Sequence, residues 1–384
     1  MITSFNVFVP SIMGSGASLQ TGIKVRNLGC KKVLVVYDKG LKEVGIADTI
    51  VENIQNAGVE TVIFDKVLPD PPDTIIEEAA EIAILERVDG IVAVGGGSSM
   101  DTAKGINVLI NNPPPIMQYF GVQINLNSGL PMVFIPTTSG TGSEVTNMCV
   151  ISCTSRGNKD SVISQVCVGT LAIIDPDLTL GLPPKMTAAT GVDALAHAVE
   201  SMTGGNSNPL SDALAMQAIR AIVKWLPVAY KDGLNLEARE HMILASMYAG
   251  MAFTNGLVHL GHSIGHTLGA HFHIPHGLAC AAALPEVIEY TARTEFKKVE
   301  MICECLGVHV PEEATTEEIG SMARISLRSF LKLVGIPNMK ELGLQLEDVM
   351  KVAPLITADG GFALIPYRIT NEKVASMLKF AYDA

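Results

Sequence analysis

The amino-acid sequence predicts an α/β domain followed by an all-helical domain. In the first half, short runs rich in Val and Ile alternate with segments of helical periodicity, and the runs end at Gly, Asp or Lys. This alternation is typical of βαβ units around a parallel sheet. Strand signals become rare after residues 178–186, where three prolines cluster. Because 384 residues exceed the usual size of one hydrophobic core, we expect two domains, 1–182 and 183–384.

The individual elements follow from residue type and spacing. Short β-branched runs predict strands within residues 31–40, 59–67, 89–97, 131–140 and 170–178. Apolar residues at helical spacing predict helices within 41–58 and 72–88, and a series of long helices that starts with 182–205.

Composition excludes several kinds of partner. The formal net charge is −12 and Lys and Arg do not cluster, which argues against a nucleic-acid surface. The N-terminal stretch lacks a secretory pattern and no stretch is long enough to span a bilayer, so we expect a cytoplasmic protein without membrane contact. Seven scattered cysteines are not a disulfide framework, and Cys303 and Cys305 are expected to be ordinary half-buried thiols.

A glycine-rich loop separates a predicted strand from a predicted helix. In "GGGSSMDTAK", residues 95–104, glycines allow close approach of a pyrophosphate to the backbone, and the following helix start favours an anion. Ser98 or Ser99 can cap that helix. The loop lacks the third glycine of G-x-G-x-x-G, so a tight turn without a ligand is an equal alternative.

Two further segments fall at the same edge of the predicted sheet. Asp38 ends the first strand, where a carboxylate can accept hydrogen bonds from an adenosine ribose or can simply cap the next helix. The stretch "PTTSGTGSE", residues 136–144, adds Gly and hydroxyl groups after another strand. Open α/β sheets bind ligands at this edge, so a nucleotide site is expected there.

The helical half concentrates histidine. Residues 259–277, "HLGHSIGHTLGAHFHIPHG", contain six of the nine histidines of the chain. Asp193 and His197 are four apart, as are His262 and His266, and residues at that spacing share a helix face. With His276 just beyond a helix, one carboxylate and three imidazoles suit a borderline divalent ion. A lone histidine is more often a core residue, but this density predicts a metal site.

With these motifs in view, the sequence resembles the iron-containing (group III) alcohol dehydrogenases over nearly its whole length. The segments that carry the resemblance are "GGGSSMDTAK", "PTTSGTGSEVT", "IIDPDL", "TAATGVDALAHAVE", "AGMAF" and "FHIPHGLA". The resemblance implies a Rossmann-like dinucleotide-binding domain and an all-α metal-binding domain, as in the dehydroquinate synthase-like fold. It also implies a homodimer or larger homo-oligomer.

Site residues carry over position by position. By resemblance, the metal ligands are Asp193, His197, His262 and His276, with His266 near the nicotinamide as the candidate that passes a proton. The positions that match cofactor contacts are Asp38, Asp70, Gly95, Gly96, Gly97, Ser98, Asp101, Thr137, Thr138, Thr141 and Lys159. Phe253 and Met148 are candidates for pocket walls or for the core, and His259, His271 and His273 are expected to line the pocket or to be solvated.

The implied activity is hydride transfer between NAD(H) and a small primary alcohol or aldehyde, with Fe²⁺ or Zn²⁺ polarising the substrate oxygen. Two departures from the family pattern lie close to the expected substrate position and leave the substrate open: His259 in "NGLVHLGHSIGH", and "LIPYRIT" at residues 364–370. A third departure, Asp70 in "LPDPP", leaves that cofactor contact open. The alternatives are an enzyme resembling glycerol dehydrogenase or dehydroquinate synthase, or a non-catalytic metal or NAD sensor.

Overall fold

The computed structural model describes residues 4–384, the side chains at 360 and 363 excepted. It contains two compact units. The α/β unit comprises Val7–Thr138 and Gly142–Gly181, and the helical unit comprises Leu182–Ala384, Ser139–Thr141 and residues 4–6. The expected ranges 1–182 and 183–384 did not assign the segment Ser139–Thr141 to the helical part. This segment packs closely against the helical unit at Gly140. A Cβ at position 140 would lie only 2.8 Å from Cβ of Thr190.

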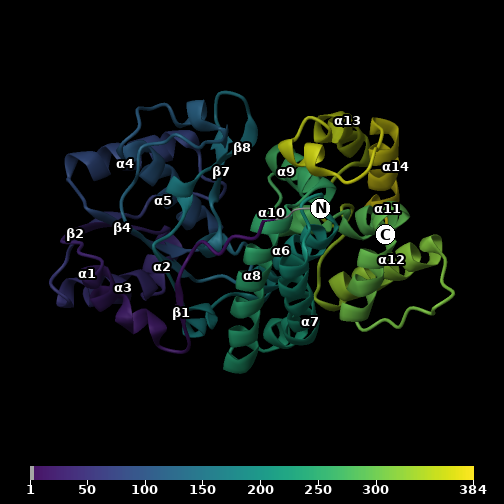
Figure 1. Cartoon of the computed structure of the whole chain (residues 1–384), viewed down its shortest axis with the longest axis horizontal. Helices are drawn as coiled ribbons and strands as arrows, with labels where there is room; N and C mark the ends of the chain where they lie inside the picture. Colours follow the sequence, from purple (N-terminus) through teal and green to yellow (C-terminus); the bar gives the residue numbers. More distant parts are fainter. Residues whose placement is uncertain (1–3) are drawn as a thin grey trace. The chain divides into compact units, whose positions relative to one another are not determined.

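A parallel sheet forms the centre of the α/β unit (Figure 1). Its order is β1-β9-β6-β4-β2-β3, and all of its described pairs run parallel. The strands are β1 (Ser11–Met13), β2 (Lys32–Val36), β3 (Glu60–Phe64), β4 (Gly90–Gly95), β6 (Met132–Pro136) and β9 (Leu171–Ile174). The five strands predicted from sequence are confirmed, and β1 is additional.

Alternate residues of the strands face opposite layers. Val33 and Val35 of β2 pack with one cluster, which includes α1 (Thr21–Asn27) and α3 (Ile46–Asn56). Leu34 and Val36 pack with the other, which includes α4 (Asp73–Leu85) and α5 (Gly97–Ile110). Figure 1 shows these helix pairs on opposite sides of β2 and β4. Burial on both faces explains why β2 and β4 are nearly continuous apolar runs rich in Val and Ile.

A second, three-stranded sheet was not predicted. It has the order β5-β8-β7, with β5 (Gly121–Val122), β7 (Met148–Cys153) and β8 (Asn158–Ile163). β7 and β8 pair antiparallel, and β7 alternates between partly and fully buried residues. The sequence signal is weak because β8, "NKDSVI", is mostly polar and only its Val162 is buried.

The strand order places a topological switch point beside the glycine loop. From β2 the chain proceeds outward to β3 at the sheet edge, and then returns to β4 on the other side of β2. Loops after β2 and β4 therefore diverge at their carboxyl ends, which is where doubly wound sheets bind dinucleotides. The predicted α/β fold is confirmed, and the strand order adds the position of the switch point.

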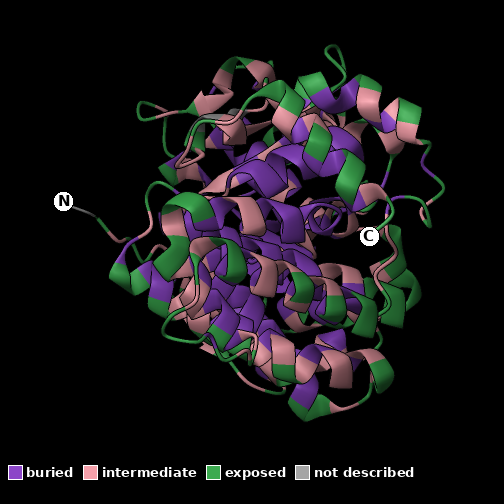
Figure 2. Ribbon diagram, turned by 90° about the vertical axis from the view of Figure 1, so that its right-hand side faces the viewer, coloured by how far each residue is buried: buried purple, intermediate pink, exposed green. Residues whose placement is uncertain are grey.

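The second unit is helical in the part of the chain that the structure describes. Its helices are α6 (Pro184–Thr203), α7 (Pro209–Lys231), α8 (Leu236–Gly256), α9 (Leu260–Phe272), α10 (His276–Ala281), α11 (Leu284–Cys305), α12 (Thr316–Leu333), α13 (Leu346–Ile356) and α14 (Asn371–Tyr382). They share one apolar core. Figure 2 shows buried inner helices enclosed by partly exposed ones. The all-helical prediction is confirmed.

α6 is the inner helix that matters most for the site, because its residues from Gly191 to Thr203 are all buried. α8 and α9 meet at a sharp bend where Leu257 has φ 67°. Among the described helices, none alone is long and apolar enough to cross a bilayer; α8 and α9 reach that length and hydropathy only together, and this pair is bent by 108°.

Candidate functional site

One face of α6 carries three ionisable side chains. Asp193, His197 and Glu200 recur at spacings of four and three, so they line the same stripe of the helix. All three are buried. A charged stripe on the most buried helix of the unit requires compensating partners.

α9 and α10 supply those partners. His262 and His266 lie one turn apart on α9, and His276 is the first residue of α10. His273 ends α9 with φ 54°, and Pro275 precedes His276 in an extended conformation. This short connection turns the chain so that His276 lies beside α6.

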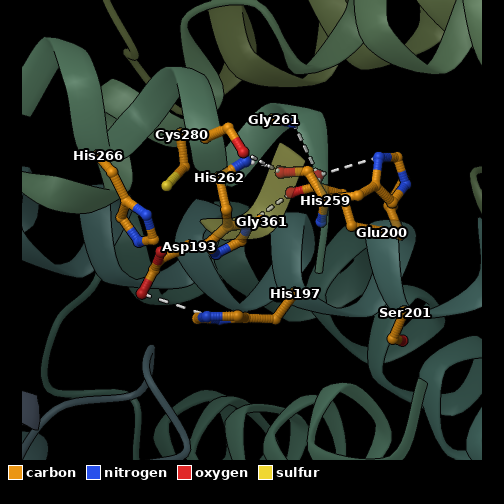
Figure 3. Close-up of polar contacts among 12 residues, drawn as sticks. Asp193, His197, Glu200, Ser201, His259, Gly261, His262, His266, Cys280 and Gly361 are labelled. Carbon is orange, nitrogen blue, oxygen red and sulfur yellow. Dashed lines mark hydrogen bonds and ion pairs between the residues drawn. The ribbon is translucent and has the colours of Figure 1, made fainter. Parts of the chain in front are cut away.

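Four side chains form a compact group that can hold a metal ion. The ligand atoms of Asp193, His262, His276 and Cys280 all lie within 4.8 Å of one another. Asp193 Oδ1 lies 3.6 Å from His276 Nε2. Figure 3 shows the thiol of Cys280 directed into the same space as the side chains of Asp193 and His262. Sequence reasoning had brought together the first three but had missed Cys280.

His197 borders this group. Its Nδ1 lies 3.9 Å from Asp193 Oδ2, and its ring is 4.5 Å from that of His262. The ring also stacks on Phe253 at 4.3 Å. Burial, followed by the positive charge of His262, lowers the pKa of His197 well below its ordinary value. A neutral imidazole is the form that binds metals.

Two buried nitrogens at the group lack hydrogen-bond partners among the described residues. They are His197 Nδ1 and His262 Nε2. Leaving a buried polar atom unsatisfied costs roughly 1–3 kcal/mol, so this arrangement is expensive without a further partner. A divalent cation would satisfy both nitrogens and would also balance the Asp193 carboxylate. The donor set therefore fits a borderline divalent ion.

Glu200 stands behind His262, and sequence reasoning missed it. Its carboxylate accepts a short hydrogen bond from His262 Nδ1, and it accepts backbone N–H groups of His259 at 3.1 Å and Gly261 at 2.8 Å. Burial raises the pKa of Glu200, but His262 and His259 outweigh it and bring that pKa down to about 2. Glu200 thus fixes Nδ1 of His262 as the protonated nitrogen. The lone pair of Nε2 is then available to bind a metal ion in the group.

His259 is buried rather than solvent-facing. Its Nε2 hydrogen-bonds Thr203 at 2.8 Å, and its Nδ1 lies 3.5 Å from Glu200 Oε1. Tyr367, from the divergent segment 364–370, packs edge-on against its ring at 6.4 Å. The expectation that His259 lines a pocket does not fit this placement, because a fully buried ring with these neighbours is part of the scaffold behind His262.

His266 lies at the outer side of the group and is about a quarter exposed. Its Nδ1 lies 3.0 Å from Asp359 Oδ2, and its ring stacks on His276 at 5.6 Å. Burial raises the pKa of Asp359, but the contact with His266 outweighs it and lowers that pKa. His271 and His273 are exposed, as expected of solvated residues.

The glycine loop has the geometry of a close-approach turn. Gly95 has φ 145°, and a Cβ there would lie 2.3 Å from Ser99 Oγ. α5 begins at Gly97 with Gly96 as N-cap and no side-chain cap. The expected capping by Ser98 or Ser99 is therefore wrong: both serines already lie within the first turn, so their backbone N–H groups are among those left for an anion.

Neighbouring strands bring other predicted cofactor residues to the same edge. Asp38 follows β2 and caps α2 (Lys39–Glu43), accepting from Leu41 N at 3.2 Å. Thr137 and Thr138 follow β6, and Thr137 N donates to Gly95 O at 3.0 Å. β2, β4 and β6 are adjacent, so the structure brings these three loops together. Met148, a candidate pocket wall, lies in β7 of the same unit.

The remaining predicted cofactor residues have intramolecular partners. Asp101 accepts from Ser143 Oγ at 2.9 Å and from Val150 N at 3.2 Å. Lys159 pairs with Asp70, Nζ to Oδ1, at 2.6 Å. Thr141 belongs to the segment that is part of the helical unit. The side chains of Asp101, Asp70 and Lys159 are therefore held in place by contacts within the α/β unit.

Comparisons with known proteins agree with this geometry. Residues 10–176 match the family described as iron-containing alcohol dehydrogenase, and residues 187–382 match the Fe-containing alcohol dehydrogenase family, C-terminal. The NAD-dependent methanol dehydrogenase of Bacillus methanolicus is 36% identical over 98% of this chain and 99% of that protein.

Solved structures are similarly close. A 1,3-propanediol oxidoreductase superposes with a TM-score of 0.94 at 36% identity, covering 99% of this chain and all of the other. The sulfoacetaldehyde reductase from Bifidobacterium kashiwanohense, solved in complex with NAD⁺, gives a TM-score of 0.89 at 28% identity over the full length of both chains.

Proposed function

We propose that this chain, which belongs to the iron-containing alcohol dehydrogenase family, interconverts a small primary alcohol and its aldehyde with NAD(H) at a divalent metal ion. It is an oxidoreductase of the NAD-dependent alcohol dehydrogenase class. The observation that carries the proposal is the group of Asp193, His262, His276 and Cys280 with His197 beside it, where His197 Nδ1 and His262 Nε2 are buried without a hydrogen bond among the described residues.

The proposed protein ligands are Asp193, His197, His262 and His276, and the ion is Fe²⁺ by family or Zn²⁺ by donor chemistry. When bound, the ion polarises the substrate oxygen and NAD(H) exchanges the hydride. Burial lowers the pKa of His262, but the neighbouring groups Cys280 and Glu200 outweigh it and leave that pKa raised well above its ordinary value. A position that stabilises a proton on this ring also stabilises a cation in its place.

His266 is the proposed proton carrier. Asp359 engages its Nδ1, so Nε2 is the nitrogen that remains to exchange a proton with the substrate oxygen. Its partial exposure gives that proton a route to solvent. Stacking on His276 and the contact with Asp359 restrict the ring orientation. Phe253 and Met148 remain candidates for pocket walls, and a homo-oligomer remains an expectation from the resemblance.

The proposed cofactor site is the edge formed after β2, β4 and β6. The N–H groups at the start of α5 and the glycines Gly95, Gly96 and Gly97 would hold the pyrophosphate. Asp38, on the far side of the switch point, would accept from the adenosine ribose. The remaining proposed contacts are Asp70, Ser98, Asp101, Thr137, Thr138, Thr141 and Lys159.

Asp38→Asn is expected to raise the ratio of kcat/KM for NADPH over NADH. Asparagine caps a helix as well as aspartate does, so the variant removes the negative charge that would repel a 2′-phosphate and retains the bond to Leu41 N. Asp48→Asn, an exposed acid on α3, is the matched control. An unchanged ratio in the Asp38 variant would reduce Asp38 to a helix cap.

Oxidation of NADH, followed at 340 nm, tests the activity itself. The chain is stripped of metal, reloaded with Fe²⁺ or Zn²⁺, and screened against short aldehydes that are unsubstituted or carry hydroxyl, sulfonate or phosphonate groups. We expect aldehyde-dependent NADH loss only in the metal-loaded protein. Binding of metal and NADH without any turnover across the screen would instead favour a sensor.

A further inference from the structure

We propose that Cys280 is a thiolate ligand of the metal ion and that it shifts the preference of the site from Fe²⁺ toward Zn²⁺. This inference rests on the metal site of the proposed function and adds a donor that the predicted ligand set does not contain. Cys280 is fully buried and lies one turn after His276 on α10. It is the only cysteine in the metal-binding group found among the described residues.

The distances are those of two ligands of one ion. Cys280 Sγ lies 3.6 Å from His276 Nε2, and Asp193 Oδ1 lies 3.6 Å from the same nitrogen. Bond lengths of about 2.0–2.3 Å, at angles of roughly 90–110° between neighbouring ligands of one ion, separate two ligand atoms by roughly 2.8–3.8 Å. Both separations fall in that interval. Nε2 of His262 is buried and has no hydrogen bond of regular geometry, and the Cys280 thiol interacts with the same ring, so both potential ligand atoms face one space.

Gly265 makes this arrangement possible. A Cβ at position 265 would lie 2.5 Å from Cys280 Sγ and 3.0 Å from Cys280 Cα. Glycine therefore lets α9 pack directly against α10. Because His262 lies three residues before Gly265, this close packing brings its ring near the thiol.

The surroundings of Cys280 differ from those of an ordinary core thiol. Cys303, equally buried in the same unit, has the carbonyl of Ile319 as its polar neighbour at 3.8 Å. The neighbours of Cys280 are instead groups that bind cations, namely Asp193, His262 and His276. A small apolar residue would fill the same space without adding a donor to the group.

Charge balance supports the assignment. When the metal–sulfur bond forms, the S–H bond breaks and its proton passes to water, because a thiol bound to a metal is deprotonated. The thiolate and the Asp193 carboxylate then contribute two negative ligand charges, which match the charge of a divalent ion. The Glu200 carboxylate lies outside this ligand set and is held by His262 and by backbone N–H groups. A soft sulfur donor favours Zn²⁺ over Fe²⁺ more strongly than oxygen or nitrogen does.

Cobalt substitution tests the bond directly. Co²⁺ bound to thiolate gives an intense near-ultraviolet charge-transfer band, whereas oxygen and nitrogen ligands give only weaker visible bands. The full-length chain, stripped by a chelator, is titrated with Co²⁺ as wild type, Cys280→Ser, Cys280→Ala and Cys303→Ser. We expect the near-ultraviolet band in wild type and Cys303→Ser, and its loss in both Cys280 variants while the visible bands persist.

Each other outcome contradicts a definite statement. Visible cobalt bands without a charge-transfer band in wild type, or a charge-transfer band that persists in Cys280→Ser, would overturn the ligand assignment and leave the proposed function intact. Absence of all cobalt bands would overturn the metal site itself, and the ligand assignment with it.

A competition titration tests the preference. Zn²⁺ and Fe²⁺ affinities are measured anaerobically against a common chelator for wild type, Cys280→Ser and Cys303→Ser. The affinity for Zn²⁺ is expected to fall in Cys280→Ser by at least the roughly tenfold that loss of an outer-shell partner costs. The affinity for Fe²⁺ should fall less, so the ratio of Zn²⁺ to Fe²⁺ affinity decreases, whereas it stays constant in Cys303→Ser. An unchanged ratio in Cys280→Ser would overturn the claim about preference.

Discussion

Replacement of His262 by alanine is expected to abolish metal-dependent turnover and to leave NADH binding intact. The variant removes Nε2, a buried nitrogen with no hydrogen-bond partner among the described residues. Metal affinity should fall by more than the roughly 10- to 100-fold that loss of an outer-shell partner costs. The proposed cofactor residues lie mainly in the α/β unit, so the fluorescence titration with NADH should be unchanged.

The same substitution should also destabilise the fold. Glu200 is fully buried and loses the side chain that donates to its Oε2. Breaking a buried charge pair costs about 3–5 kcal/mol, and we expect the lower end of that range because backbone amides still bond to Glu200. Metal content, NADH oxidation and urea unfolding are the three measurements.

His271→Ala is the matched control, since His271 lies on the same helix and is exposed. Its effect on stability should stay within about 0.5 kcal/mol, with full metal content. If His262→Ala kept its metal and its turnover, His262 would leave the ligand set. The His262 and His271 variants would then not differ in metal content or turnover.

The sequence was sufficient for the parts of the structure that depend on local pattern. β2 and β4 are nearly continuous apolar runs rich in Val and Ile because both of their faces are covered, and that composition predicts a buried parallel strand. Asp193 and His197 share a helix face because their spacing is four. The proximity of Asp193 and His276 was a prediction from residue type, and their separation of 3.6 Å agrees with it.

Features that depend on tertiary packing could not be predicted from the local sequence pattern. Glu200 is one acid among many on helices, and only the approach of α9 gives it three donors. In the sequence Cys280 is indistinguishable from a core thiol. Only the close packing of α9 on α10 at Gly265 places it beside the ionisable side chains. β8 is mostly polar, so its composition does not predict a strand. Its antiparallel pairing with β7 defines it instead.

Glu200→Gln is expected to weaken metal binding by roughly 10- to 100-fold, the usual effect of losing an outer-shell partner. Glutamine keeps the size and one acceptor oxygen but removes the negative charge that polarises the Nδ1–H of His262. The ring should therefore stay in place while its Nε2 binds the metal ion more weakly. Saturating metal should restore most of the turnover, and this restoration separates a binding effect from a loss of catalytic geometry.

Glu286→Gln supplies the matched comparison, because Glu286 is another buried carboxylate of the helical unit and pairs with Arg328 at 3.0 Å, Oε1 to Nε. That variant should lose stability but keep wild-type metal affinity, as measured by chelator competition. Equal losses of affinity in both variants would mean that Glu200 acts only through the general stability of the helices. Unchanged affinity in Glu200→Gln would mean that the charge behind His262 does not tune its donor nitrogen.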